Sequence, residues 1–125
     1  MICGIGMDIV EVCRVEKIIE KWGNKFTKRY FSESEINYCE KMTFPAIHFS
    51  ARFAVKESFI KAVGVHYADG LHMKDIETIH NDRGGPVLKV YEKIKEMVDE
   101  RKIKNIHVTI SHTKKYAVAC VILEI

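Results

Sequence analysis

The sequence predicts an α+β fold, in which a mainly antiparallel sheet packs against one long central helix. Residues 45–64 form an apolar stretch of helical length that begins with a proline and ends with a glycine. Residues 106–110 and 116–123 are two strand-like runs joined by a short polar turn, as in a hairpin. Helical and strand-like runs without any repeat, linker or low-complexity tract indicate a single α+β domain over residues 1–125.

The chain begins with an expected buried strand at residues 2–10. Gly4 and Gly6 lie in this apolar run and allow another part of the backbone to approach closely. Residues 12–22 follow with the spacing of an amphipathic helix, which predicts a stripe of side chains facing the core. The members of this stripe are Val15, Ile18, Ile19 and Trp22.

Two further helices are expected in the first half of the chain. Ser32 followed by Glu35 is a capping-box pattern, which predicts a short helix that extends to about Met42. Pro45 is well suited to the first turn of the long helix, which should end near Gly64.

The second half of the chain is richer in strands. The expected elements are strands at 73–80 and 87–90, a helix at 91–101, and the hairpin strands 106–110 and 116–123. The turn signal between the first two strands is Asn81-Asp-Arg-Gly-Gly-Pro86, and the hairpin turn is Ser111-His-Thr-Lys-Lys115.

The composition excludes several classes of protein. Hydrophobic residues make up 47% of the chain and charged residues 30%, as in a folded globular protein. No apolar run approaches the roughly 20 residues of a membrane span, and the first residues lack the features of a secretory signal. The four cysteines have neither CxxC nor metal-ligand spacing. We therefore expect reduced thiols in a cytoplasmic protein that does not associate with a membrane.

Basic residues gather in one part of the chain. Residues 11–30 hold six basic and three acidic side chains, and the rest of the chain is neutral. The exposed basic face of this segment consists of Arg14, Lys17, Lys21 and Lys25. Such a face favours an acidic partner, although a solvated helix surface is the simpler alternative. Nucleic acid is not expected, because the aromatic residues nearby fit the core.

Asp8, Glu57 and Lys61 are charged residues in apolar surroundings. Asp8 is the only charge in residues 1–10, and the other two lie four apart on the long apolar helix. A carboxylate from a strand and one from a helix suit Mg²⁺, which prefers oxygen ligands and binds together with phosphate groups. Lys61 can reach the same ligand and offset the charge of a departing phosphate. The alternative is an ordinary ion pair between Glu57 and Lys61, with Asp8 capping a nearby backbone.

The polar turn between the hairpin strands is a second candidate site. His112 is flanked there by Ser111 and Thr113, a group that suits a phosphate but is equally compatible with a solvated hairpin. The other histidines considered show no spacing typical of metal ligands, so no zinc site is expected. These histidines are His48, His66, His72 and His80.

Three segments of the sequence carry a resemblance to a known family. They are Gly4-Ile-Gly-Met-Asp8, Phe49-Ser-Ala-Arg-Phe-Ala-Val-Lys-Glu-Ser-Phe-Ile-Lys61-Ala62 and Ile110-Ser-His-Thr113. In this order and spacing they resemble holo-[acyl-carrier-protein] synthases, the small trimeric class of the 4′-phosphopantetheinyl transferase superfamily. The resemblance covers essentially the whole chain. The first segment alone is weakly specific, whereas its combination with the second is strongly specific and favours the metal site over the ion pair.

The resemblance implies a magnesium-dependent transfer reaction. The 4′-phosphopantetheine arm of coenzyme A passes to a serine of apo-acyl carrier protein, adenosine 3′,5′-bisphosphate is released, and the product supports fatty acid biosynthesis. In this interpretation Asp8 and Glu57 hold Mg²⁺ on the coenzyme A pyrophosphate. Lys61 stabilises or protonates the leaving bisphosphate, and the serine proton goes to a carboxylate or a metal-bound water. The basic face would guide the acidic carrier to the site.

The resemblance also implies contacts with coenzyme A. His112, Ser111 and Thr113 would lie near the nucleotide phosphates. Arg52 and Lys56, on the long helix, would either bind phosphate as well or brace the site, and for Arg52 bracing is slightly favoured.

The chain differs from the pattern of the superfamily at two places. Larger two-domain relatives have an acidic residue at the position of Val10, so water is expected in place of a third carboxylate on the metal. The family often has a basic residue before the turn proline, where this chain has Gly85 and Pro86. A phosphate contact from this turn would therefore come from backbone amides. Because the small relatives are homotrimers with interfacial active sites, we expect a homotrimer, with the apolar strands from Ile106 onward at its interface.

Two other functions remain open at this stage. A magnesium-dependent phosphohydrolase of a coenzyme A-like nucleotide would use the same two carboxylates without a carrier protein. A non-enzymatic binder would use the basic face to hold RNA or an acidic protein. Asp8 among apolar residues is unexpected for a simple binder and weighs against it.

Overall fold

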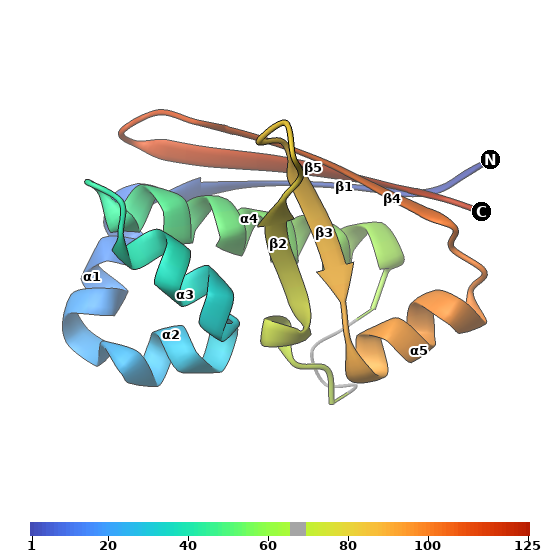
Figure 1. Cartoon of the computed structure of the whole chain (residues 1–125), viewed down its shortest axis with the longest axis horizontal. Helices are drawn as coiled ribbons and strands as arrows, with labels where there is room; N and C mark the ends of the chain where they lie inside the picture. The colour runs from blue at the N-terminus through green and yellow to red at the C-terminus, as the bar shows by residue number, and fades with distance from the viewer. Residues whose placement is uncertain (66–69) are drawn as a thin grey trace.

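The chain folds around a three-stranded antiparallel sheet and a long helix that packs on it. The structure is a computed structural model that describes residues 1–65 and 70–125. The main sheet has the order β1-β5-β4, and helix α4 lies along one face of it (Figure 1). The elements of this central unit are β1 Ile2–Glu11, β5 Tyr116–Glu124, β4 Asn105–His112 and α4 Pro45–Val63. The predicted α+β class is confirmed.

The remaining elements surround α4 on the side away from the main sheet (Figure 1). They are α1 Val12–Trp22, α2 Asn24–Tyr30, α3 Glu33–Glu40, the 3-10 turn η2 Met73–Asp75, β2 Ile76–His80, β3 Pro86–Val90 and α5 Glu92–Glu100. Strands β2 and β3 form a second antiparallel sheet. Helix α2 was not predicted, because its 7 residues are too short to show a helical period. The strand expected from residue 73 begins at Ile76, since its first three residues form η2. His66 lies outside the described residues.

Helix α4 is buried on nearly every side, as its composition predicts. Pro45 occupies the first turn, and Gly64 ends the helix in the left-handed conformation (φ 78°) with its N–H donated to the carbonyl oxygen of Ile60 at 2.9 Å. Its buried apolar side chains are Phe49, Ala51, Ala54, Val55, Phe59, Ile60 and Val63. A helix with buried residues all round has to form the centre of the core.

Two glycines place strand β1 directly against α4. A Cβ atom at Gly6 would lie 1.8 Å from the backbone oxygen of Ser58, and one at Gly4 would lie 2.2 Å from that of Ala62. No other residue type therefore fits at this contact without moving the backbone. The close approach predicted from the sequence is confirmed, and it places Asp8, two residues beyond Gly6, alongside the same helix.

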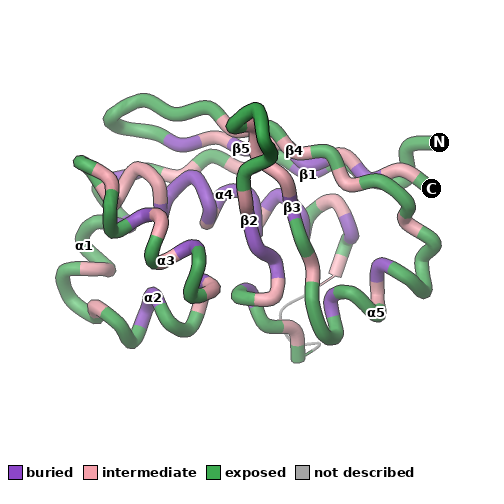
Figure 2. The backbone as a smooth tube through the Cα atoms, in the orientation of Figure 1, coloured by how far each residue is buried: buried purple, intermediate pink, exposed green. Residues whose placement is uncertain are grey.

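The expectation that β1 is buried is wrong for one of its faces. Ile5, Met7 and Ile9 lie on the face of β1 opposite to Gly4 and Gly6, and they are 62%, 61% and 63% exposed. Figure 2 shows that buried and less buried stretches alternate along the strands of the main sheet. They continue onto the apolar residues of β5, because Ile5 pairs with Ile122 and Ile9 pairs with Val118. Strand β1 thus has α4 on one face only. We call the outward side chains of β1 and β5 the outer apolar face. The sequence predicted an interface on the strands from Ile106 onward, which are β4 and β5. Of these two, only β5 belongs to the outer apolar face, because the outward residues His107 and Thr109 of β4 are polar.

Helix α1 buries fewer residues than its period predicts. Val15 is 3% exposed and belongs to the core, but Ile18 and Trp22 are 37% and 51% exposed. Both line an open recess of about 540 Å³ whose wall includes Phe26 and Phe53. A periodic stripe shows which residues share a face, but not how much of that face the rest of the fold covers.

All four cysteines are free thiols, and burial raises the pKa of Cys39 to about 12. Among the residues that the structure describes, no helix has the length and apolar character needed to cross a membrane.

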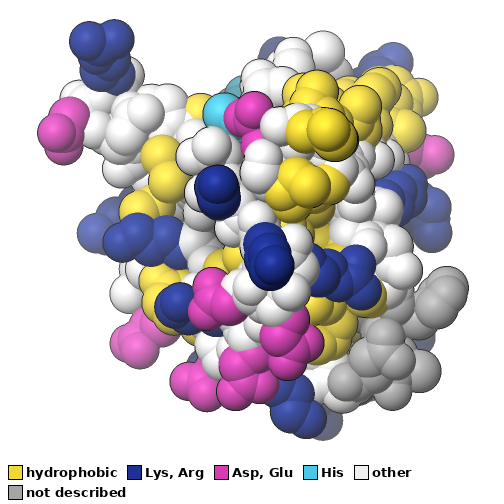
Figure 3. Space-filling view, turned by 90° about the vertical axis from the view of Figure 1, so that its right-hand side faces the viewer, with side chains coloured by type: hydrophobic (Ala, Val, Ile, Leu, Met, Phe, Trp, Pro, Cys, Tyr) yellow, Lys and Arg dark blue, Asp and Glu magenta, His cyan; other side chains and the backbone are white. Residues whose placement is uncertain are grey.

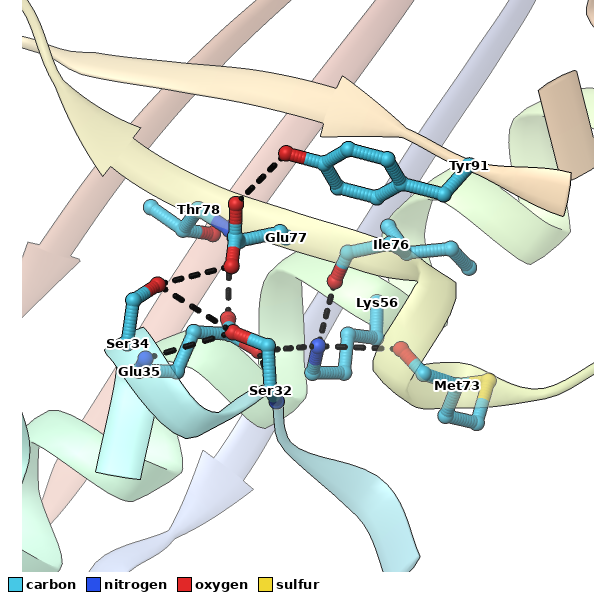
Figure 4. Close-up of polar contacts among 9 residues, drawn as sticks. All are labelled: Ser32, Ser34, Glu35, Lys56, Met73, Ile76, Glu77, Thr78 and Tyr91. Atoms are coloured by element: carbon cyan, nitrogen blue, oxygen red, sulfur yellow. Dashed lines mark hydrogen bonds and ion pairs between the residues drawn. The ribbon is translucent and has the colours of Figure 1, made fainter. Parts of the chain in front are cut away.

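A buried ion pair joins α3, α4 and η2. Lys56 of α4 donates from Nζ to Glu35 Oε1 at 2.7 Å, and also to the backbone oxygens of Met73 and Ile76 (Figure 4). Both side chains of the pair are 0% exposed. Glu35 also accepts the N–H of Thr78 at 3.1 Å, so its carboxylate connects α3 to strand β2.

A second carboxylate extends this network toward α5. Glu77 accepts hydrogen bonds from the hydroxyls of Ser34, at 2.7 Å, and Tyr91, at 2.8 Å (Figure 4). Burial alone would raise the pKa of Glu77, but these hydrogen bonds outweigh it and lower the pKa below its usual value. The hydrogen bond from Tyr91 to Glu77 raises the pKa of Tyr91, because Tyr91 is the donor. The network fixes α3 and β2 on α4.

Replacing Lys56 with Met should lower the free energy of unfolding by about 3 kcal/mol, because it leaves the Glu35 carboxylate buried without its cation. Urea denaturation measures this loss. The matched control is Lys95→Met, which breaks an exposed Lys95–Asp99 pair of 3.2 Å and should change stability by less than about 0.5 kcal/mol. Equal losses in the two variants would contradict a structural role for the buried pair.

Candidate active site

Two carboxylates that are distant in the sequence line the same cleft. Asp8 of β1 and Glu57 of α4 both border a cleft of about 340 Å³, which Arg14 and Phe53 also line. The Asp8 side chain is 18% exposed, so it is partly desolvated but still accessible. Because Gly6 packs directly on α4, Asp8 and Glu57 lie at the same end of the interface between β1 and α4. The structure therefore brings together the residues that the sequence singled out.

Lys61 belongs to this site through Asp8. Its Nζ donates to Asp8 Oδ1 at 3.1 Å and to the backbone oxygen of Met7 at 3.1 Å. The lysine side chain is 54% exposed, so the ion pair opens to solvent. The ordinary alternative was a pair between Glu57 and Lys61 within one helix. The structure shows an ion pair that joins helix to strand, between Lys61 and Asp8, and this pair places Lys61 at the candidate metal site.

The donor set at the cleft fits magnesium better than zinc. Within residues 1–65 and 70–125, no group of three or more His, Cys, Asp or Glu side chains could hold a metal ion. Asp8 already attracts a cation, the ammonium group of Lys61. Two carboxylates leave room for water and phosphate oxygens, as Mg²⁺ requires, whereas structural zinc takes four protein ligands.

The β4–β5 turn is an ordered hairpin that presents His112 to α4. The Thr113 hydroxyl accepts the N–H groups of Lys115 and Tyr116, each at 3.1 Å. Ser111 and His112 end strand β4, and the imidazole of His112 lies 5.6 Å from that of His48 between ring centroids. The hairpin and the candidate phosphate site are therefore compatible, and Thr113 has a structural role in either case.

Arg52 is buried against Tyr38, and two of its donors have no partner among the described residues. It is 3% exposed, and its guanidinium carbon lies 4.1 Å from the ring centroid of Tyr38, a close cation–π contact. Within the part of the chain that the structure describes, its Nε and Nη2 groups have no hydrogen-bond partner. Because buried donors are nearly always paired, these two favour a partner that is not among the described residues, such as an anion or a water molecule.

Lys56 has to be removed from the candidate contacts with coenzyme A. It was expected to bind phosphate or to brace the site, and the structure supports only bracing. Its amino group is fully buried and has three protein acceptors, which leaves no donor for a ligand. Sequence alone did not identify Glu35 as its partner, because a capping glutamate is usually exposed.

The expected contact at Gly85 and Pro86 is also wrong. The contact depended on free backbone amides, but the N–H groups of Arg83 and Gly85 both donate to Asn81 Oδ1, each at 2.9 Å. Pro86 has no N–H and pairs with His80 in the β2–β3 ladder. The amides of Arg83, Gly84 and Gly85 are thus used within the turn.

The basic face is exposed and lies next to the cleft. Arg14 lines the cleft, and Lys25 lines the neighbouring apolar recess together with Ile18 and Trp22. Lys17 and Lys21 are exposed on the same helix. The two apolar residues were assigned to the core from their period, so the sequence did not reveal that the basic face borders an apolar recess. The exposure of Ile18 and Trp22 reveals this recess, and their exposure can be known only from the folded structure.

Comparison with known proteins identifies the class of protein. Residues 4–121 match the family model of the 4′-phosphopantetheinyl transferase superfamily. The chain belongs to this superfamily. Its relatives show which group of transferases within the superfamily it resembles.

The relatives are holo-[acyl-carrier-protein] synthases. The synthase of Syntrophus aciditrophicus (strain SB) is 48% identical over 124 residues, which are 99% of this chain and 97% of that protein. The crystal structure of the synthase from Neisseria meningitidis superimposes with a TM-score of 0.91 at 28% identity and covers 99% of each chain. That from Bacillus anthracis str. Ames, in complex with CoA (3′,5′-ADP), has a TM-score of 0.79 and 36% identity over 98% and 96% of the two chains. The resemblance carried by the three sequence motifs is confirmed.

Proposed function

We propose that residues 1–125 act as one holo-[acyl-carrier-protein] synthase domain. The chain transfers the 4′-phosphopantetheine group of coenzyme A to a serine of apo-acyl carrier protein, in the cytoplasm and in support of fatty acid biosynthesis. The observation that carries this proposal is the convergence of Asp8, Glu57 and Lys61 at one cleft, next to an exposed basic face. The relatives named above are synthases of this kind.

Asp8 and Glu57 are the residues that hold Mg²⁺ and, with it, the pyrophosphate of coenzyme A. When bound, the metal polarises the phosphate under attack and neutralises the charge that grows during transfer. The serine oxygen forms a bond to the phosphorus that carries the pantetheine arm. The bond from this phosphorus to the bridging oxygen breaks, and adenosine 3′,5′-bisphosphate leaves with both electrons.

Lys61 acts on the charge of the leaving bisphosphate, and a base accepts the serine proton. The Lys61 ammonium, next to Asp8, stabilises or protonates the departing bisphosphate. The serine proton passes to a carboxylate of the cleft or to solvent. Because phosphoryl transfer depends mainly on positioning and on charge stabilisation, these groups meet the requirements of the reaction.

The nucleotide end of coenzyme A contacts a different part of the protein. His112, Ser111 and Arg52 provide donors for the nucleotide phosphates, and Thr113 shapes the turn that carries two of them. Arg52 and Glu57 are five residues apart on α4, so their side chains point about 140° apart. One chain thus presents its carboxylates and its phosphate donors on different sides of the same helix.

A homotrimer with active sites at its interfaces resolves this separation. The carboxylates of one subunit would then face the phosphate donors of another. The outer apolar face supports assembly, because a sheet face that exposes Ile5, Met7 and Ile9 is typical of an interface. Hydrophobic side chains also gather over the upper part of the molecule, where the main sheet lies (Figure 3).

The carrier protein docks on the basic face and the adjoining recess. Arg14, Lys17, Lys21 and Lys25 attract its acidic surface, while Ile18 and Trp22 offer apolar contacts. Charge complementarity at the rim mainly accelerates association, and desolvated apolar contacts at the centre mainly slow dissociation.

Reversing the charge of Arg14 and Lys21 to Glu should raise the KM for the carrier at least about tenfold and leave the KM for coenzyme A nearly unchanged. Steady-state kinetics with each substrate varied in turn measures both. The matched control is the double reversal of Lys93 and Lys95, two exposed lysines of α5. Equal changes in the two KM values, or an equal effect of the control, would contradict the docking site.

The transferase is distinguished from its rivals by whether nucleotide release requires the carrier. Coenzyme A and Mg²⁺ are incubated with the protein, with and without apo-acyl carrier protein, and adenosine 3′,5′-bisphosphate is quantified by chromatography. We expect release only with the carrier, one molecule per carrier molecule. Release of phosphopantetheine or phosphate without the carrier would identify a phosphohydrolase. Carrier binding without any release would identify a binder.

A further inference from the structure

A cavity that the proposed reaction does not use lies between α1, α2, the end of α3 and the first turns of α4. Figure 1 shows these elements gathered at one end of the molecule. The cavity has a volume of about 600 Å³, and the residues assigned above to the metal, the nucleotide and the carrier are not part of its described wall. The apolar part of this wall includes Val12, Ile19, Phe44, Pro45, Ile47 and Phe49. This volume and this lining are typical of sites that bind small molecules.

The charged side chains of this wall are mostly acidic. Glu16 and Glu20 of α1 and Glu40 at the end of α3 provide three carboxylates. Lys114, from the turn between β4 and β5, is the one basic residue among the described residues of the wall. In the part of the chain that the structure describes, none of these three carboxylates forms an ion pair. The start of α4 adds only about half a positive charge. The wall therefore carries a net negative charge, which favours a cation.

One buried polar group of the same wall has no partner. Thr27 of α2 lines the cavity and is 3% exposed, and its hydroxyl forms no hydrogen bond with a described residue. Buried hydroxyl groups are nearly always paired, because an unpaired one loses its hydrogen bonds to water without a replacement. The hydroxyl oxygen can accept a hydrogen bond from an N–H donor that enters the cavity.

We propose that this cavity binds a small organic cation, a protonated amine on an apolar or aromatic body. The body fills the apolar part of the cavity, and the ammonium group lies beside the carboxylates of α1. An anion would be repelled by these carboxylates, and a neutral apolar molecule would leave the Thr27 hydroxyl without a partner. The inference goes beyond the proposed function, because this site requires neither coenzyme A nor the carrier.

The test uses three probes that share an apolar body and differ in charge, namely phenylbutylamine, phenylbutanol and phenylbutyrate. Isothermal titration calorimetry at low ionic strength gives their affinities for the full chain. We expect the amine to bind at least about tenfold more tightly than either of the other two probes. The double variant Glu16→Gln, Glu20→Gln should lose this preference and keep its affinity for the alcohol. The matched control is Glu96→Gln, Glu100→Gln, which changes two exposed glutamates with the same spacing on α5 and should retain the preference.

A further variant, Ala46→Phe, tests where the amine binds. Ala46 lines the cavity from the first turn of α4, so the larger side chain should occupy the cavity and weaken amine binding at least about tenfold. Urea denaturation shows whether each variant is folded. The inference is overturned if the amine does not bind, if the three probes bind equally, or if the carboxylate binds most tightly. It is also overturned if the preference persists in the Glu16→Gln, Glu20→Gln variant, or if folded Ala46→Phe binds the amine as before.

Discussion

Replacing Asp8 with Asn, or Glu57 with Gln, should lower the rate of carrier modification by about a thousandfold or more. Each change removes one negative charge from the pair that holds the metal and keeps the size of the side chain. Both residues line the cleft from elements that are fixed by the core. Activity is measured by single-turnover loading of the carrier, and folding by circular dichroism and urea denaturation.

The matched control for Asp8 is Asp99→Asn. Asp99 pairs with Lys95 at 3.2 Å, and Asp8 pairs with Lys61 at the similar distance of 3.1 Å. The Asp99 pair, however, lies on the exposed surface of α5. This variant should keep full activity. Excess Mg²⁺ should partly rescue a variant that has lost one of two metal ligands, and it should have no effect on the control. Full activity of Asp8→Asn would contradict the assignment of the metal site.

Replacing Gly6 with Ala should lower the free energy of unfolding by about 4 kcal/mol or more. The new Cβ would lie 1.8 Å from the backbone oxygen of Ser58, an atom that α4 cannot move without displacing its neighbours. Strand β1 therefore has to shift, and Asp8 shifts with it. A misplacement of about 1 Å can cost on the order of a hundredfold in rate, so any folded fraction should also be impaired.

Gly85→Ala is the control for this prediction. Its Cβ would meet only the side chain of Asn81, at 3.3 Å, and a flexible side chain can move. Urea denaturation of the two variants should differ by several kcal/mol, on the scale of a severe packing defect. Comparable stabilities would show that β1 and α4 do not pack as closely as the structure indicates.

Local signals predicted the main elements well. Pro45 and Gly64 marked the two ends of α4, and Ser32 with Glu35 marked the start of α3 through a capping box that the structure confirms. Gly4 and Gly6 indicated a close backbone contact without naming its partner. These signals succeed because caps, turns and glycine contacts depend on residues close in the sequence.

The errors arose where the outcome depends on distant parts of the chain. Ile18 and Trp22 have the period of core residues, yet the described part of the chain leaves them 37% and 51% exposed. Lys56 resembled a phosphate ligand until Glu35, a residue of another helix, was found beside it. His48 and His80 showed no pattern in the sequence, because separate elements bring their rings to Tyr38. Long-range packing determines such surroundings, and local periodicity contains no record of it.

Intact mass spectrometry of the carrier protein tests the central claim most directly. Apo-acyl carrier protein is incubated with this protein, coenzyme A and Mg²⁺, and its mass is then compared with that of the untreated carrier. The account predicts that the carrier gains one phosphopantetheine group on its serine, and that the gain requires both coenzyme A and the metal. A carrier of unchanged mass, with protein shown to be folded and able to bind coenzyme A, would contradict it.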